Sequence, residues 1–166
     1  MITRGKHTEI ELAYTAGLID GEGHIIIEAT RRSNPKYKCV QHILMIGCTN
    51  TNLEIIEWIS KTYGSSKPIR KRNHEKNPRW KTAYEWNISA KKALVFLEMI
   101  YPYLKIKKEQ ARLCIEFQKD KMNRKFTTSG ITNGHTLSKE TLSKREEYYL
   151  KVKKLNQKGI AAATTK

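Results

Sequence analysis

The apolar positions at the start of the chain follow a helical period. Ile10, Tyr14 and Leu18 recur every four residues, which predicts a helix with these three side chains facing a core. Thr8 to Glu11 has the pattern of a capping box, in which a hydroxyl and a carboxylate each satisfy a free amide of the first turn. We therefore expect a helix that starts at Thr8 and packs through its fourfold repeat.

After residue 23 the apolar residues recur at every second position. Farther along the chain, stretches with this twofold spacing alternate with stretches of helical spacing. Alternation of apolar and polar residues predicts strands, and three- or fourfold spacing predicts helices. The order is helix, two strands, helix, two strands, then further helices. The expected strands cover residues 24–32, 36–49, 65–72 and 79–88, and the expected helices cover residues 53–63, 90–101 and about 105–118.

The last third of the chain has a different character. Residues 119–137 are basic and polar, which predicts a loop or a partly ordered arm. Ser143 to Glu146 repeats the capping-box pattern and predicts the opening of a C-terminal helix, at about residues 138–158. Residues 159–166 are expected to fray. The whole chain is expected to be one domain, 1–166, with its core at about residues 8–118.

The charge balance points to an acidic partner. The chain has 32 Lys and Arg against 16 Asp and Glu, a net charge of +16 and a sequence pI of about 9.8. Nucleic-acid binding fits these values, although ribosomal and membrane-surface proteins are also basic, so charge alone does not choose. We expect no membrane segment, no signal peptide, and three reduced structural cysteines in an intracellular protein.

The candidate reactive residues lie at the end of the first predicted helix, in Asp20-Gly21-Glu22-Gly23. Two carboxylates are held at the end of a helix, just before an apolar strand. The glycines predict a left-handed cap at this helix end, and the four residues alone are also what a helix cap followed by a tight turn would show. These four residues alone therefore do not distinguish a functional motif from a helix cap, and the residues before them must be considered as well.

The nine residues from Thr15 to Gly23 resemble the motif of the LAGLIDADG homing endonucleases. The departures are Thr15, Gly21 and Glu22, and Glu22 matters most because the family places its metal-binding carboxylate there. The resemblance covers about residues 8–118. It implies an α+β homing endonuclease fold, in which repeated α-β-β units form a curved four-stranded antiparallel sheet that binds DNA and is backed by helices. The positions that match letter for letter are Ala16, Gly17, Leu18, Ile19, Asp20 and Gly23.

The resemblance also implies a metal-dependent site. Glu22 would be the carboxylate ligand of a divalent ion, expected to be Mg²⁺, and the Gly21 carbonyl would be a second ligand. Lys107 would polarise a water or stabilise developing charge, and Asn50 would be the polar group that follows the second strand. An equally good interpretation is that Lys107 is one more solvated lysine in a run of basic residues. Asp20 is expected to stabilise the helix end or a dimer contact.

The motif occurs once, and relatives of this length with one motif are homodimers. Small residues recur every four positions on the first helix, and such a face allows two backbones to approach closely. The alternative is that these residues only let the helix pack on its own sheet. The residues expected at a two-fold contact are Ala13, Gly17, Asp20 and Gly21.

The polar faces of the strands are the expected DNA surface. Arginine can read guanine and glutamine can read adenine, while lysines contact phosphates without specifying sequence. A slip of one residue in register would exchange the two faces of each strand. The expected DNA-binding residues are His24, Ile26, Glu28, Thr30, Arg32, Gln41, Arg70, Arg72, Lys81 and Glu85, with Lys71, Lys119 and Lys121 among the expected phosphate contacts.

The sequence thus predicts a site-specific, metal-dependent endonuclease for double-stranded DNA, acting as a homodimer on a long pseudo-palindromic target and encoded by a mobile intron. The alternative is an RNA maturase, for which intron RNA would be the partner, or a DNA-binding regulator that does not cleave. Glu22 discriminates between them, because a scaffold retired from catalysis has no need of a carboxylate at that position. A basic ribosome-associated protein would explain the charge and leave the motif unexplained.

Overall fold

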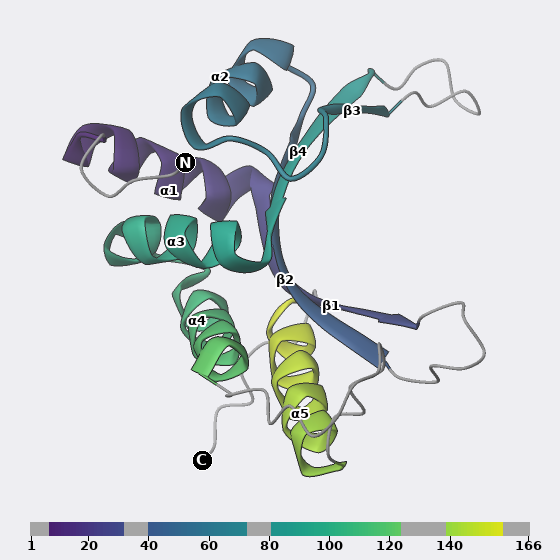
Figure 1. The fold of residues 1–166 in the computed structure, drawn as a ribbon. Coiled ribbons are helices and arrows are strands. Elements are labelled where there is room, and N and C mark those ends of the chain that lie inside the picture. The colour runs from purple at the N-terminus through teal and green to yellow at the C-terminus, as the bar shows by residue number, and fades with distance from the viewer. Residues whose placement is uncertain (1–6, 32–39, 73–80, 124–138, 158–166) are drawn as a thin grey trace, which may run out of the picture.

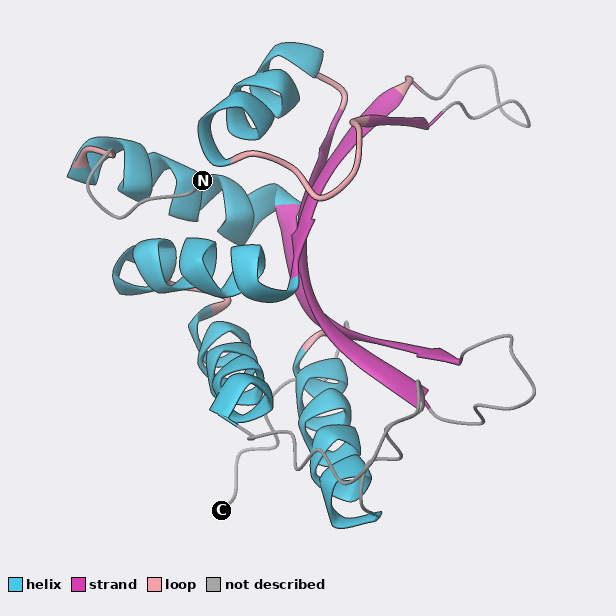
Figure 2. Ribbon diagram, viewed as in Figure 1, coloured by secondary structure: helices cyan, strands magenta, loops and turns pink. Residues whose placement is uncertain are grey.

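The computed structural model describes residues 7–31, 40–72, 81–123 and 139–157. The strands form one strongly curved layer, all helices lie on its convex side, and the concave side is left open (Figures 1 and 2). No helix of these described segments is long and apolar enough to cross a membrane. The predicted α+β architecture with a curved four-stranded sheet is confirmed.

The sheet is antiparallel and has the order β1-β2-β4-β3. Its long central pair places Ile25 of β1 opposite Ile46 of β2, which lies opposite Ile88 of β4. These three side chains are fully buried under the helices. Side chains alternate across a strand, so the residues one position away face the open side. The strands are β1 (Gly23–Arg31), β2 (Val40–Asn50), β3 (Arg70–Arg72) and β4 (Ala83–Ser89).

The helices cover the apolar face of the sheet. Aromatic rings fill the space between helices and sheet: Tyr63, Trp86 and Phe96 are buried and meet edge to face, and the Trp86 indole donates to the Gly64 carbonyl at 2.7 Å. This satisfies the polar atom of the largest buried side chain. The helices are α1 (Glu9–Glu22), α2 (Leu53–Tyr63), α3 (Ala90–Ile100), the short 3₁₀ turn η1 (Tyr101–Tyr103), α4 (Lys108–Asn123) and α5 (Lys139–Leu155).

The predicted core face of α1 is wrong. Ile10 is 84% exposed and Tyr14 is 56% exposed, and only Leu18 of that repeat packs against the core. The buried face instead runs through Thr15 and its neighbours Ala16 and Ile19. A threonine can be buried here because its hydroxyl donates to the Glu11 carbonyl at 2.7 Å and meets the Tyr63 hydroxyl at 2.9 Å.

Element ends also differ from the sequence patterns. The left-handed glycine cap expected for α1 is absent, since Gly23 has φ −89° and leads directly into β1. Gly64 does end α2, with φ 73°. The strand predicted from residue 65 is β3 only from Arg70 onward, although the Ser66 amide still bonds the Asn87 carbonyl of β4 at 2.9 Å.

The C-terminal helix begins earlier than its capping pattern predicts. Helix α5 starts at Lys139, so Ser143 is an exposed residue of its interior and the predicted second capping box is wrong. The helix lies against β1 and β2, with Val152 buried and His42 of β2 bonded to Glu146 at 2.9 Å. Helix α4 likewise continues to Asn123, five residues into the predicted loop, whose remainder lies outside the described residues.

Candidate active site and nucleic-acid interface

Both ends of α1 are fixed by local contacts, a capping box at the start and a close backbone contact at Gly23. The Thr8 hydroxyl accepts the Glu11 amide at 3.2 Å, and the Glu11 carboxylate accepts the Thr8 amide at 3.4 Å, as predicted. At the other end, a Cβ on Gly23 would lie 2.7 Å from the Ile19 carbonyl oxygen, so only glycine fits. The chain therefore passes straight from helix to strand, and Glu22, the last helical residue, is left exposed beside the start of β1.

Asp20 clamps a distant segment onto this helix end. Its carboxylate accepts three successive backbone amides, from Lys105 at 2.7 Å, Ile106 at 3.1 Å and Lys107 at 2.9 Å. Burial alone would raise the pKa of Asp20, but these hydrogen bonds and the Lys107 charge outweigh it and hold the pKa below its usual value. The Asp20 carboxylate is thus engaged within the chain at the end of α1, and its expected part in a dimer contact stays a prediction.

The clamp brings Lys107 to the motif. Its ammonium donates to the Ile19 carbonyl at 3.0 Å and also to the Asp20 carbonyl, so it supplies the positive charge that the last turn of α1 lacks. Burial lowers the pKa of Lys107, partly opposed by the nearby charges of Asp20 and Glu22. Lys107 is thus a held charge next to the motif and not a free surface lysine. Its role in catalysis stays a prediction.

Glu22 and the Gly21 carbonyl offer oxygen ligands at the same point. Within the described part of the chain, the Glu22 carboxylate is exposed and no hydrogen bond engages it. Carboxylate and carbonyl oxygens are the donor set that Mg²⁺ accepts, with several waters retained. The described residues contain no group of three or more acidic, His or Cys side chains that could hold a metal. Among the described residues, the oxygens of Glu22 and Gly21 are therefore the donors that this end of α1 offers to a metal.

Two further candidates have local partners. The Asn50 side chain accepts the Asn52 amide at 2.8 Å, which belongs to the turn from β2 into α2, so the expected catalytic role of Asn50 stays a prediction. His24 follows the motif on the open face, opposite Gly47 of β2. A Cβ on Gly47 would lie 2.5 Å from the His24 ring, so this glycine makes the space in which the imidazole lies. No sequence signal had indicated that role for Gly47.

The alternation predicted for the strands is confirmed. His24, Gly47 and Asn87 are register partners on the open face, one step from the buried row of Ile25, Ile46 and Ile88. The concave face of the sheet thus carries one set of side chains, most of which are partly or fully exposed. The expected DNA-binding residues on this face are His24, Ile26, Glu28, Thr30, Gln41 and Arg70, while Lys81 is exposed just before β4.

Three of the expected DNA-binding residues need comment. Glu85 lies on the concave face between its register partners Thr49 and Arg70, but it is only 8% exposed and so is less accessible than its neighbours. The backbone of Arg72 belongs to β3, but its side chain lies outside the described residues. Arg32 lies entirely outside them.

The sequence was next compared with known families and structures. The family model described as LAGLIDADG endonuclease matches residues 15–110, more than half of the chain, from the motif through the Lys107 segment. The chain belongs to the LAGLIDADG endonuclease family. No curated protein matches it significantly.

Solved homing endonucleases share the LAGLIDADG fold of this chain. The structure of I-CvuI in complex with the I-CreI target has a TM-score of 0.69 and 23% identity, over 92% of this chain and 86% of that one. The archaeal intron-encoded I-Vdi141I complexed with DNA has a TM-score of 0.66 and 18% identity, over 93% and 89%. I-TnaI has a TM-score of 0.61 and 18% identity, over 89% and 97%. At these identities the likeness establishes the fold.

The LAGLIDADG helix α1 also presents an open small-residue face. Ala13, Gly17 and Gly21 are exposed, and a Cβ built on either glycine would meet no atom within 4 Å. These residues therefore do not serve the packing of α1 on its own sheet, which was the alternative explanation of their spacing. The exposed Ile10 and Tyr14 extend the same helix surface, and the Tyr14 ring meets Trp58 of α2 edge to face at 5.5 Å.

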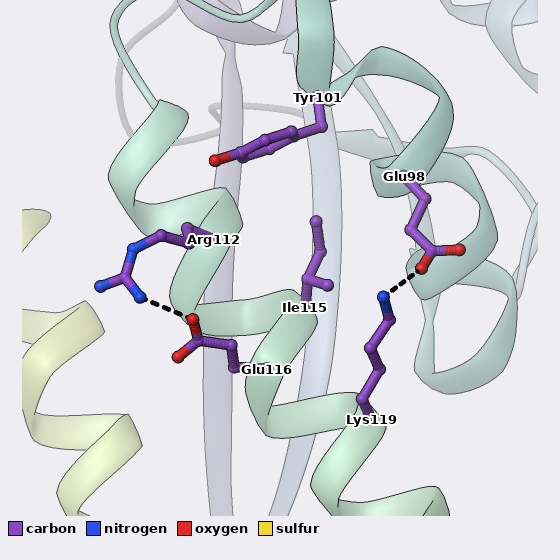
Figure 3. A pocket seen from close by; sticks show the side chains of 6 residues that line it. All are labelled: Glu98, Tyr101, Arg112, Ile115, Glu116 and Lys119. Carbon is purple, nitrogen blue, oxygen red and sulfur yellow. Dashed lines mark hydrogen bonds and ion pairs between the residues drawn. The ribbon is translucent and has the colours of Figure 1, made fainter.

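A hollow of about 360 Å³ lies on the helical side of this LAGLIDADG chain, away from the concave face. Figure 3 shows that its charged side chains are already paired, Arg112 with Glu116 at 2.6 Å and Lys119 with Glu98 at 2.8 Å. Lys119 therefore does not lie where a phosphate on the concave face would reach it. Lys121, also on α4, donates to the His42 carbonyl at 2.8 Å. Both lysines belong to α4, which packs behind the sheet, and their expected phosphate contacts stay predictions.

Proposed function

We propose that this chain is a site-specific, metal-dependent endonuclease for double-stranded DNA, encoded by a mobile intron. The observation that carries the proposal is the placement of Glu22 and Lys107 at one end of α1, where the concave face begins. The exposed Glu22 carboxylate and the Lys107 ammonium, which is fixed by its hydrogen bond to α1, lie at the edge of the open sheet face. Two such groups are suited to the hydrolysis of a phosphodiester that is bound across that face. The net charge of +16 suits a polyanionic substrate.

Each residue of the site has a distinct task. A bound divalent ion supplies an activated water and relieves charge on the phosphoryl oxygens. Glu22 and the Gly21 carbonyl would hold that ion. Lys107, fixed by its contacts to α1, would stabilise the negative charge that develops on the phosphate. Asp20 holds the Lys107 backbone through an amide at 2.9 Å and so orients this ammonium without touching the substrate.

The active form is proposed to be a homodimer that joins two copies of α1. The open face of Ala13, Gly17 and Gly21 allows close approach of two helices, and Ile10 and Tyr14 would be buried with it. The chain covers 86% of the I-CvuI chain but only 46% of the I-SmaMI chain, so the same fold unit makes up less than half of some relatives. A two-fold arrangement of this chain would reproduce that larger assembly and bring two Glu22 carboxylates together.

The proposed substrate follows from the same geometry. I-CvuI and I-Vdi141I are described in complex with DNA, and I-CvuI with Mg or Ca. A two-fold protein reads two half-sites, so the target is expected to be long and nearly palindromic. DNA bound along the concave face would place its scissile phosphates near the two motifs.

Random-sequence duplex libraries test the proposal. The protein should retain a small set of duplexes in Ca²⁺ and cut the same set in Mg²⁺, leaving uncut the duplexes that it does not bind. Retention of specific duplexes without cleavage at any Mg²⁺ concentration would contradict the enzymatic assignment and favour a regulator. Preference for structured RNA over every duplex would contradict it in favour of a maturase.

A further inference from the structure

The concave face contains an apolar patch that the chain itself does not cover. It consists of Ile26 on β1 and Ile43 and Met45 on β2. Ile26 lies directly opposite Met45 in the register, and Ile43 is two residues from Met45 on the same face. The three side chains are therefore neighbours, and all three are partly exposed.

The patch is separate from the hydrophobic core. Among the described residues, none of the three belongs to the buried core or packs against it from the edge, whereas their strand neighbours Ile25, Leu44 and Ile46 are buried on the other face. A strand with one solvated face usually carries polar residues there. Threonine would keep the β-branched preference for a strand without exposing apolar surface. Strand propensity alone does not explain isoleucine at these positions.

We propose that this patch reads the C5-methyl groups of thymines in the major groove of the target. The inference rests on the proposed function, because it assigns specificity to the same DNA-binding face. Thymine is the base that presents an apolar group in the major groove, where the other base edges offer only hydrogen-bond donors and acceptors. A patch of Ile and Met can contact a methyl group but cannot satisfy a donor or acceptor, so it rejects cytosine and guanine by leaving their polar edges unpaired.

The surroundings of the patch favour a nucleic acid over another protein as its occupant. The patch continues on one face into the polar side chains of His24, Thr30 and Gln41, and it begins close to the exposed Glu22 of the motif. Exposed Arg70 and Lys81 lie farther along the same sheet. An apolar patch flanked by polar side chains, with the cationic Arg70 and Lys81 farther toward β3, suits base edges of a groove with phosphates beyond them.

The strand geometry gives the expected position in the target. A strand advances about 3.3 Å per residue and a duplex about 3.4 Å per base pair, so one residue corresponds to about one base pair. Ile26 follows Glu22 by four residues, and Ile43 is the register partner of Glu28, six residues after Glu22. Thymine preference is therefore expected at about four to six base pairs from the scissile phosphate in each half-site, by the same rise per residue.

Parallel selections from two random duplex libraries test this inference, one built with thymine and one with uracil in place of thymine. Uracil keeps the hydrogen-bonding edge and lacks only the methyl. The full chain in Ca²⁺ should enrich thymine at the stated positions from the first library and lose that preference with the second. For a selected duplex, each contacted methyl removed should weaken binding about fourfold, the factor equivalent to about 0.8 kcal/mol per buried methyl.

Two variants connect the effect to the patch. Ile43→Ser removes every methyl group of this side chain and should abolish thymine-over-uracil discrimination at the outer position, about six base pairs out, while the inner position is retained. Leu150→Thr, which replaces an exposed apolar side chain on α5 behind the sheet, is the matched control and should leave that discrimination unchanged. Circular dichroism and thermal melting confirm that both variants fold.

The outcomes separate the inference from the proposed function. Specific duplexes that bind equally well with uracil would overturn the thymine assignment and leave the endonuclease proposal standing. Discrimination that survives Ile43→Ser unchanged would overturn the assignment to this patch. Absence of enrichment from both libraries would overturn the proposed function itself.

Discussion

The Asp20 carboxylate accepts the backbone amide of Lys107 at 2.9 Å, while the ammonium of the same lysine returns to α1 and donates to the Ile19 carbonyl at 3.0 Å. The two residues are 87 positions apart and hold each other in place. The buried carboxylate of the motif thus fixes the position of Lys107, the lysine proposed to act on the phosphate. This relation ties the end of the helix to the segment before α4 and makes one rigid site from two distant stretches.

Asp20→Asn should lower the free energy of unfolding by about 2–3 kcal/mol at pH 7, because charge-assisted hydrogen bonds to three part-buried backbone amides lose their charge. The pKa of Asp20 is lower when folded, so its contribution is present above the unfolded value of about 3.9 and is lost as the pH falls through the folded value. Chemical denaturation between pH 3 and 7 should show the difference between the two proteins narrowing toward low pH.

Glu22→Gln is the matched control for that experiment. Its carboxylate is two residues away and exposed, so the substitution should leave stability nearly unchanged at every pH. An Asp20→Asn deficit that is constant from pH 3 to 7 would show that the Asp20 charge is not the source of the stabilisation.

Gly47→Ala should destabilise the sheet by about 1–3 kcal/mol, the usual cost of adding an atom to a filled space. The new Cβ would lie 2.5 Å from the His24 ring and 2.9 Å from the Trp86 carbonyl oxygen. Adding His24→Ala should recover part of the loss, since the ring clash is removed while the carbonyl remains. Thermal melts of the two single variants and the double variant measure this coupling. Additive single effects would contradict the packing described.

Much of the fold could be predicted from the sequence because strand alternation is a strong signal when one face is buried. The faces assigned to β1, β2 and β4 are correct over their described lengths. Helix α1 was misread because its exposed side carries Ile10 and Tyr14, and a pattern of apolar residues cannot tell a core face from a face kept for another molecule. Its true core face includes Thr15, whose burial depends on the distant Tyr63.

The site was predictable in part for a similar reason. The family resemblance pointed to Glu22 and Lys107, and the structure places both at the end of α1, while their catalytic roles stay predictions. The Asp20 clamp and the space that Gly47 leaves for His24 depend on contacts between segments far apart in the sequence, for which a single sequence carries no signal. The expected bounds of the C-terminal helix, about 138–158, agree with α5, but Ser143 lies inside this helix and does not cap it.

Gly17→Leu tests the proposed two-fold contact. A Cβ at Gly17 meets nothing within 4 Å in the single chain, and leucine is a better helix former by about 0.8–1 kcal/mol, so folding should be unimpaired. Sedimentation should show a dimer for the parent protein and a monomer for the variant. Lys61→Leu, which places the same side chain on an exposed position of α2, should remain a dimer. A dimeric Gly17→Leu protein, or a parent that stays monomeric on DNA, would contradict the contact.

Binding to DNA should depend steeply on salt. If the complex neutralises about ten phosphates, the logarithm of the affinity should fall with the logarithm of salt concentration at a slope of about −9. Fluorescence anisotropy on a selected duplex, measured in Ca²⁺ over a range of KCl concentrations, gives this slope. A value shallower than about −3 would show that the net charge of +16 is not a DNA-binding footprint.

The most direct test of the account is cleavage of a selected duplex in Mg²⁺ by the parent protein and the Glu22→Gln variant, with binding measured alongside. Glutamine keeps the length of the side chain but not the charge that would hold the metal, so cleavage should collapse while binding and folding are retained. Lys107→Met should slow cleavage less, because the metal ligands remain. A Glu22→Gln protein that binds and cuts at close to the parent rate would contradict the assignment of the motif as the catalytic centre.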